Sequence, residues 1–209
     1  MTELREVALI MLAKAPEPGR VKTGLCPPCT HDEAAALAAA ALADTMDAVV
    51  AAPARRHVWA VDGPVRTGVA APIELVPQRG EGLDERLAAA FEDVGGPALL
   101  VGMDTPQVTA ELLGHASSVL MTPGVDAVLG PAFDGGYWAI GLHRADPEVF
   151  LGVPMSDPTT GAAQWRRLAT LGLRTRLLPA LEDVDDIASA RSVARMVPWS
   201  RFAARLACM

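Results

Sequence analysis

Short apolar segments alternate along the chain with longer segments in which apolar residues recur every three or four positions. Residues 7–12 form a continuous apolar run, which is typical of a strand covered on both faces. Residues 31–52 have the periodicity of a helix, and Thr30 is placed to act as its N-cap. The same criteria predict strands at 7–12, 57–61, 73–76, 98–101, 127–129, 137–142 and 174–178, and helices at 31–52, 83–94, 107–121, 159–171 and 184–196.

This alternation predicts an α/β fold, a Rossmann-like α/β/α sandwich with a mostly parallel central sheet and helices on both faces. Ligands bind such sheets at the carboxyl ends of the strands, so the functional loops are expected after Leu12, Val76, Val101 and Leu129. Neither an internal repeat nor a linker divides the chain. We therefore expect a single domain over 1–209, with its core at about 7–196 and an amphipathic tail that packs onto it.

Composition narrows the class of partner. The chain has 209 residues, a net charge of −7 and 4% aromatic residues, which argues against a nucleic-acid partner and against base-stacking platforms. The first residues lack the features of a secretory signal. Residues 34–52 are long enough to cross a bilayer, but Asp44 and Asp47 fall inside them, so no integral membrane segment is predicted. We expect a cytoplasmic protein that acts on small molecules.

The loop after the first strand is basic. Lys14, Arg20 and Lys22 lie close together where a phosphate is expected, and flexible lysines with an arginine fork can clamp a di- or triphosphate. It is not a Walker A loop, because that motif needs glycine before its lysine and Val21 is there. An ordinary solvated basic loop is the alternative.

The loop after the third predicted strand contains Gln78, Gly80 and Arg86. The amide of Gln78 suits a base, the charge of Arg86 suits a phosphate, and glycine lets the backbone approach a ligand. A dinucleotide fingerprint would need another glycine at Glu85, so a nicotinamide or flavin cofactor site is not supported. A plain turn into the next helix is the alternative.

Carboxylates at two further strand ends suit a divalent cation. Asp104 follows the strand at 98–101, and Asp183 and Asp185 follow the last strand within an acidic run. Magnesium takes one or two carboxylates and completes its shell with water and phosphates. The alternatives are an N-cap role for Asp104, with Pro106 in the first helical turn, and a solvated helix start at 182–186.

The loop 133–138 holds the only tyrosine of the chain, Tyr137, next to Asp134, Gly135 and Gly136. It is either a β-hairpin or a place where glycines admit a substrate. Elsewhere, Cys26 and Cys29 have the spacing of a redox or zinc pair, but further ligands at zinc spacing are missing, so this interpretation is the weaker one.

Taken in order, these loops resemble the type-A glycosyltransferase-like superfamily of nucleotide-diphosphosugar transferases. Within it, the chain is most similar to a bacterial family of radical-SAM/selenodomain-associated transferases, related to the guanylyltransferases for molybdenum cofactor and for 2-phospho-L-lactate. The resemblance runs from Leu9 to about Met196. It rests on AKAPEPGRVKT (13–23), GEGLDERLAAAF (80–91), GMDTP (102–106), GPAFDGGYWAIGL (130–142) and LLPALEDVDD (177–186).

The resemblance implies roles for these residues. The phosphates of the nucleotide would face Lys14, Arg20 and Lys22, and the nucleotide pocket would be shaped by Gln78, Gly80 and Arg86. The cation would lie on Asp104 with Asp185 or Asp183, and the acceptor by Asp134, Gly135, Gly136 and Tyr137. The family usually has arginine where this chain has Gly24, so one phosphate contact is expected to be missing, which favours a diphosphate-sugar donor.

The resulting hypothesis is an Mg²⁺- or Mn²⁺-dependent transferase in which Asp104 and Lys22 are catalytic, through positioning and electrostatics. Glycosyl transfer from a nucleotide-diphosphate sugar to a small acceptor is the first expectation. A nucleotidyltransferase of the guanylyltransferase kind, acting on a phosphorylated small molecule, is the alternative. A nucleotide-binding or regulatory domain with little turnover is a third reading. The base, the sugar, the acceptor and the oligomeric state are not determined by the sequence.

Overall fold

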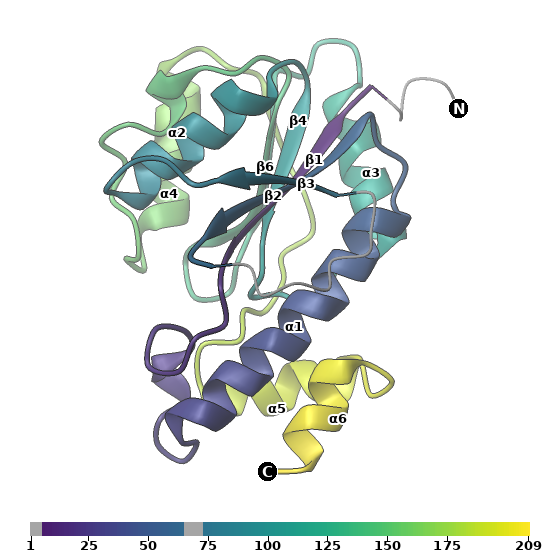
Figure 1. Cartoon of the computed structure of the whole chain (residues 1–209). Coiled ribbons are helices and arrows are strands. Elements are labelled where there is room, and N and C mark those ends of the chain that lie inside the picture. Colours follow the sequence, from purple (N-terminus) through teal and green to yellow (C-terminus); the bar gives the residue numbers. More distant parts are fainter. Residues whose placement is uncertain (1–5, 65–72) are drawn as a thin grey trace.

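The computed structural model describes residues 6–64 and 73–209 and contains a seven-stranded sheet (Figure 1). The strands are β1 (Ala8–Lys14), β2 (Arg56–Asp62), β3 (Glu74–Pro77), β4 (Ala98–Gly102), β5 (Ala127–Pro131), β6 (Tyr137–Leu142) and β7 (Thr175–Leu177). Their order across the sheet is β3-β2-β1-β4-β6-β5-β7. Strand β6 is antiparallel to both its neighbours, and the other pairings are parallel. The predicted mostly parallel sheet is confirmed.

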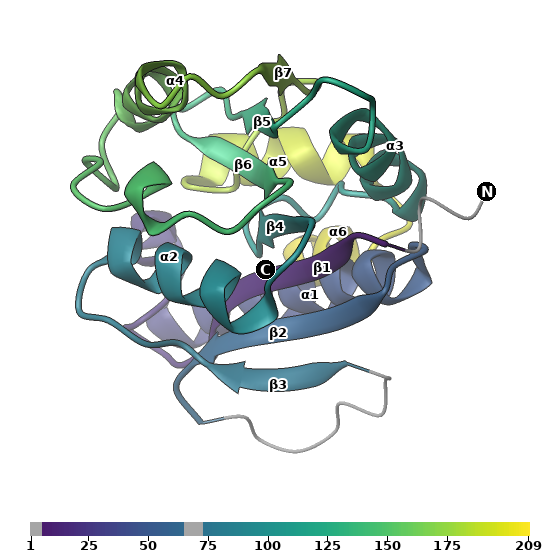
Figure 2. The same ribbon diagram turned by 90° about the horizontal axis from the view of Figure 1, so that it is seen from above.

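Helices cover both faces of this sheet (Figure 2). They are α1 (His31–Ala51), α2 (Leu83–Val94), α3 (Ala110–Leu120), α4 (Thr160–Thr170), α5 (Ile187–Met196) and α6 (Arg201–Ala207), with short 3₁₀ helices η2 (Thr23–Leu25) and η3 (Pro147–Val149). Thr30 caps α1 as expected, because its side chain accepts a hydrogen bond from the Glu33 amide. The predicted α/β/α layering is therefore present.

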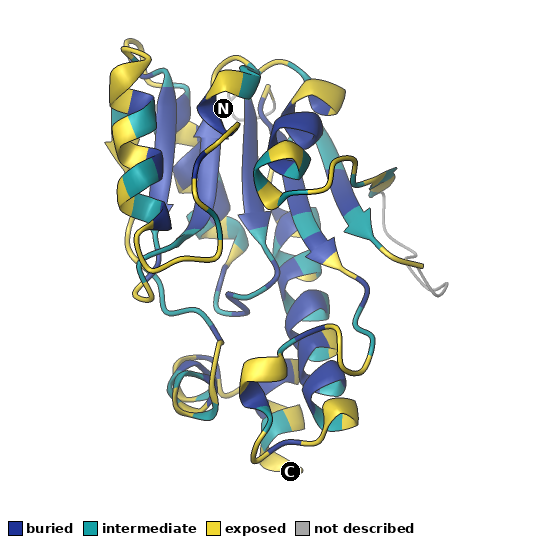
Figure 3. Cartoon of the chain, turned by 90° about the vertical axis from the view of Figure 1, so that its left-hand side faces the viewer, coloured by how far each residue is buried: buried dark blue, intermediate teal, exposed yellow. Residues whose placement is uncertain are grey.

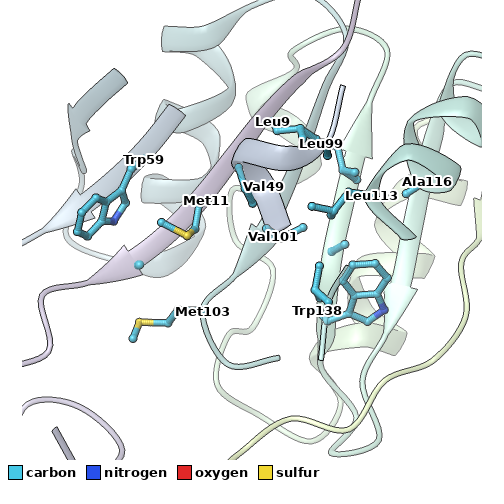
Figure 4. Packing of buried hydrophobic residues seen from close by; sticks show 14 of the residues in the cluster. Leu9, Met11, Val49, Trp59, Leu99, Val101, Met103, Leu113, Ala116 and Trp138 are labelled. Carbon is cyan, nitrogen blue, oxygen red and sulfur yellow. The ribbon is translucent and has the colours of Figure 1, made fainter. Parts of the chain in front are cut away.

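Strand β1 shows how the core divides into two layers. Leu9 and Met11 pack on the face covered by α1 and α3, whereas Ala8 and Ile10 pack on the face covered by α2 and α4. This follows from the two-residue period of a strand, and burial on both faces explains the uninterrupted apolar run. Figure 4 shows the first layer, in which Met11 and Trp59 lie on one side of Val101 and Trp138 on the other.

A third apolar cluster lies beyond the sheet, below the carboxyl end of β1 in Figure 1. It joins the first half of α1 to α5, α6 and the segment that contains Leu25. The tail packs against α1 as expected, because Phe202 is 1% exposed, although Trp199 before it is 81% exposed. Figure 3 shows this helical part apart from the strands. The helices of the third cluster therefore lie at the carboxyl end of β1.

The start of α3 differs from the prediction. The helix begins at Ala110 instead of residue 107, and Thr109 caps it by accepting a hydrogen bond from the Leu112 amide. The N-cap interpretation of Asp104 is therefore wrong, and Pro106 lies in the preceding turn. The apolar pattern started the helix too early because Val108 is buried from a turn. Because Asp104 does not cap α3, its side chain can interact with other residues at the carboxyl ends of the strands.

Helix α1 is long and apolar enough to cross a membrane by length and composition, with a mean hydropathy of 1.6. Core helices of globular domains meet the same criterion. Here α1 contributes buried residues to the sheet layer and to the third cluster.

Candidate active site

The centre of the candidate site is Lys22, which follows the basic loop. Its side chain is only 8% exposed, and its Nζ lies 2.6 Å from Asp104 Oδ1 and 3.7 Å from Asp185 Oδ1. The same Nζ donates a hydrogen bond to the carbonyl of Val184. The backbone of Lys22 is left-handed, with φ 50° and ψ 37°, a conformation that is costly for a residue with a side chain. The fold therefore holds this ammonium group at a cost in backbone energy.

Backbone contacts hold together the three segments around Lys22, which contain Gly24, Asp104 and residues 184–185. The Val184 amide donates to the Asp104 carbonyl at 3.0 Å. Gly24 lies so close to the last of these segments that a Cβ there would be 2.4 Å from the Asp185 carbonyl oxygen. A side chain does not fit in this arrangement. The glycine that the sequence presents as a lost phosphate contact thus has a packing function.

Three carboxylates lie close together beside these segments. Asp134, Asp183 and Asp185 each offer an oxygen, and these oxygens lie within 4.8 Å of one another. The turn between β5 and β6 brings Asp134 there, because the Phe133 amide donates to the Leu181 carbonyl at 3.0 Å. Sequence reasoning placed Asp134 on the acceptor side, whereas the structure groups it with the two aspartates assigned to a cation.

The charges in the site do not balance. Burial, together with the negative charges of Asp134, Asp104 and Asp185, raises the pKa of Asp183 to about 7, while Lys22 opposes the shift. Burial is also the main reason that the pKa of Asp185 is raised. Among the described residues, Asp183 Oδ1 is buried and has no hydrogen-bond partner. One ammonium group faces four carboxylates, so the site has an excess of negative charge that a further cation would reduce.

The second group of predicted residues lies at the ends of β1, β2 and β3. Gln78 Nε2 donates to the carbonyls of Ala13 at 3.0 Å and Ala60 at 2.9 Å. Its amide nitrogen is therefore occupied by the ends of two strands, and only its side-chain oxygen is left to face a ligand. Gln78 fixes the shape of this region.

Arg86 is held in the same region by an ion pair that the sequence interpretation missed. Its guanidinium lies 2.7 Å from Asp62 Oδ2 and also donates to the Gly80 carbonyl at 3.1 Å. Asp62 is the last residue of β2, and a carboxylate at the end of a strand is the feature by which the sequence could have indicated it. Gly80 has a φ of +112°, a backbone conformation that favours glycine.

The other two basic residues of the first loop lie farther out. Lys14 is exposed at the end of β1, and Arg20 is exposed and pairs with Glu17 at 2.6 Å. Of the three basic residues, Lys22 is the one that the structure pairs with the acidic group.

The loop with the single tyrosine is a hairpin, since β5 and β6 pair in antiparallel fashion. A Cβ on Gly135 would lie 1.9 Å from the Pro158 carbonyl oxygen, and the Gly161 amide donates to the Gly135 carbonyl. The space that side chains on Gly135 and Gly161 would need is therefore occupied by backbone atoms of the chain itself. The Tyr137 hydroxyl lies 3.4 Å from Gln164 Oε1, and burial raises the pKa of this tyrosine.

The cysteine pair gains no partners from the fold. Cys26 and Cys29 are both free thiols, and burial raises the pKa of Cys29, which disfavours its thiolate. Within residues 6–64 and 73–209, the group of His, Cys, Asp and Glu side chains close enough to share an ion is the aspartate triad. Neither cysteine belongs to this group.

Gln78 provides a first test of this geometry. Replacing it by methionine, which has a similar length but no donor, is expected to lower the free energy of unfolding by about 1–2 kcal/mol, because two carbonyls lose their donor. Chemical denaturation with urea measures the change. An unchanged midpoint would show that the strand ends do not depend on these hydrogen bonds.

Comparisons with known proteins place the fold. Residues 36–157 match the protein family described as "Uncharacterized protein conserved in bacteria (DUF2064)". A search of curated proteins finds no significant match. A crystal structure from Desulfovibrio desulfuricans G20, provisionally assigned as a nucleotide-diphospho-sugar transferase, is 27% identical, with a TM-score of 0.85 over 97% of this chain and 94% of that one.

More distant structures share the fold. CMP:2-keto-3-deoxy-manno-octonic acid synthetase in complex with CTP is 12% identical, with a TM-score of 0.61 over 92% of this chain and 98% of that chain. Rv0371c from Mycobacterium tuberculosis H37Rv in complex with manganese is 19% identical, with a TM-score of 0.52 over 90% of this chain and 98% of that chain. The resemblance to the nucleotide-diphosphosugar transferase superfamily is confirmed, and further structures with this fold are named as a cytidylyltransferase and a nucleotidyl transferase.

Proposed function

Because the chain belongs to the DUF2064 family of bacterial proteins and has the fold of nucleotide-using transferases, we propose that it is a divalent-cation-dependent glycosyltransferase. Its donor would be a nucleoside-diphosphate sugar and its acceptor a small molecule. The observation that carries this proposal is the excess of carboxylates around one buried lysine at the carboxyl ends of the parallel strands. The likeness to the Desulfovibrio protein over nearly the whole chain supports the choice of donor.

The residues present fit Mg²⁺ or Mn²⁺. All available ligand atoms are carboxylate oxygens, which these hard cations prefer. The buried oxygen of Asp183 lacks a partner, as expected for an atom that a cation satisfies. The cation would be held by Asp183 and Asp185, with Asp134 or Asp104 completing the set. Manganese bound to the Mycobacterium protein agrees with this choice. When bound, the cation would neutralise the charge that develops on the departing diphosphate.

The chain's own cations would supply the rest of the electrostatic stabilisation. Lys22 lies next to the carboxylates, and the exposed Lys14 and Arg20 of the same loop would bind the diphosphate of the donor. Catalysis would then rest on positioning and electrostatics, because charges already placed beside the phosphates of the bound donor stabilise the charge that develops there.

Base and sugar would be held by different elements. The ends of β2 and β3 and the first turn of α2 form one side, where Gln78, Gly80 and the Arg86–Asp62 pair set the shape of the nucleotide pocket. The β5–β6 turn forms the other side, where Asp134 is exposed and Tyr137 is half-buried. The acceptor would bind on this second side, beside the exposed Asp134.

Thermal-shift and calorimetric titration tests the proposal against UDP-glucose, GDP-mannose, UTP, GTP, CTP and GDP, with and without Mn²⁺ or Mg²⁺. We expect a nucleotide-diphosphate sugar to stabilise the protein only with the cation, by about 2.7 kcal/mol at a ligand concentration 100 times the Kd. Turnover should release a nucleoside diphosphate. Release of pyrophosphate from a triphosphate would instead indicate nucleotidyl transfer, and the absence of any cation-dependent shift would contradict both.

A further inference from the structure

Asp104 and the aspartate triad are separated by a lysine. The resemblance implies that Asp104 binds the cation, yet the carboxylates that lie close together are Asp134, Asp183 and Asp185. Asp104 is instead engaged with Lys22 Nζ at 2.6 Å. Asp185 belongs to both groups, since it also lies 3.7 Å from the same nitrogen.

The surroundings of this nitrogen are those of a small cation site. Lys22 Nζ is surrounded by the carboxylate oxygens of Asp104 and Asp185 and by the Val184 carbonyl oxygen. An all-oxygen set of carboxylates and a backbone carbonyl is also what a divalent cation takes. With 8% of the side chain exposed, the ammonium is inserted between the segments and is not a solvated surface charge.

We propose that Lys22 is the resident cation of the site in the metal-free protein, and that binding of a divalent cation releases it from Asp104. The inference rests on the proposed function, because it needs a cation site at these carboxylates. Asp104 then leaves the lysine and joins Asp183 and Asp185 as a ligand. The ammonium, freed beside the cation, turns toward the phosphates of the donor.

Charge is the physical reason for this exchange. A monovalent ammonium and a divalent cation a few ångströms apart repel each other strongly in a partly buried site, so they compete for Asp104 and Asp185. In the metal-free state the lysine prevents the carboxylates from repelling one another.

Lysine labelling tests the release in the unmodified protein. The chain has two lysines, and Lys14 is exposed whereas Lys22 is buried, so each molecule carries its own reference. With an amine-acetylating reagent and peptide mass spectrometry, we expect Lys22 to react much more slowly than Lys14 without metal. Mn²⁺ should accelerate the reaction of Lys22 several-fold and leave Lys14 unchanged. A rate at Lys22 that Mn²⁺ leaves unchanged or lowers would overturn the inference.

Calorimetry with Mn²⁺ alone tests the competition. Lys22→Met removes the resident charge, and we expect it to bind Mn²⁺ about ten-fold more tightly than the parent. Arg56→Met is the matched control, since it removes one positive charge from an ion pair with Glu74 at the amino end of β2, whereas Lys22 lies beyond the carboxyl end of β1. Equal or weaker binding by Lys22→Met would contradict competition. If that variant does not fold, the labelling experiment decides alone.

The two proposals fail in different ways. Absence of Mn²⁺ binding in the parent, with and without nucleotide, would overturn the proposed function and this inference with it. If Mn²⁺ and nucleotide bind together but neither the labelling of Lys22 nor the affinity of Lys22→Met changes as expected, only the inference fails. The cation would then lie on the triad with Lys22 still bound to Asp104.

Discussion

Asp183→Asn is expected to weaken cation binding strongly and, in the absence of cation, to stabilise the folded protein. Its oxygen is buried without a partner and lies among three other carboxylates, so the charge is unfavourable until a cation arrives. We expect the affinity for Mn²⁺ to fall by about 100-fold or more, since even indirect changes at metal sites cost 10- to 100-fold. At pH 8 the free energy of unfolding of the metal-free protein should rise, by at most about 4 kcal/mol, because Asp183 is ionised there although its pKa is about 7 in the folded protein instead of 3.8.

The pH dependence of stability has a definite sign. The pKa of Asp183 is about 7 in the folded protein, against an ordinary value of 3.8. Between these two pH values the folded protein binds more protons than the unfolded chain, so the contribution of Asp183 to stability falls as the pH rises. Its destabilising effect is absent below about pH 4 and fully present above pH 7. Asp183→Asn should therefore flatten this part of the curve.

Thermal denaturation between pH 4 and 8 without metal, followed by Mn²⁺ calorimetry, measures both effects. Asp186→Asn is the control, because it removes the same charge three residues away, while asparagine can still cap α5 through the Ser189 amide. We expect the control to keep its affinity for Mn²⁺. A destabilised Asp183→Asn protein with normal affinity would show that Asp183 is a structural residue and not a cation ligand.

Restoring the usual family arginine at position 24 is expected to damage the site. A Cβ on Gly24 would lie 2.4 Å from the Asp185 carbonyl oxygen, where ordinary contacts are 3.4–4 Å, so the backbone must move by about 1 Å. Gly24→Arg and Gly24→Ala should each lose about 1–3 kcal/mol of stability. Because Asp185 moves with its backbone, the affinity for Mn²⁺ should fall about 10- to 100-fold.

Urea denaturation and Mn²⁺ calorimetry on both variants, beside Gly114→Ala, measure this effect. Gly114 lies inside α3, and a Cβ there would meet only the Pro53 ring at 4.0 Å, so alanine should be neutral or slightly stabilising. Tighter nucleotide binding by Gly24→Arg at unchanged stability would contradict the packing explanation. It would support the interpretation of Gly24 as a lost phosphate contact.

The hydrophobic pattern predicts most of the fold because each strand and helix is encoded locally. Both faces of β1 are buried, which leaves an uninterrupted apolar run, and the limits of α2 and β6 agree with the prediction. The start of α3 was wrong for a related reason. Val108 is buried by tertiary contacts of a turn, so its apolar character does not report helical periodicity.

The sequence by itself determined which residue types form the site and at which edge of the sheet they meet. These are basic residues after the first strand and carboxylates after later strands. Parallel strands ensure this, because their carboxyl ends lie on one side. Only the tertiary structure decided the pairings. Lys22 reaches Val184 across 162 residues, Asp134 joins Asp183 through a hairpin hydrogen-bonded to residue 181, and Gly24 admits the Asp185 backbone. Such contacts depend on how loops close and pack over the sheet, which residue spacing does not encode.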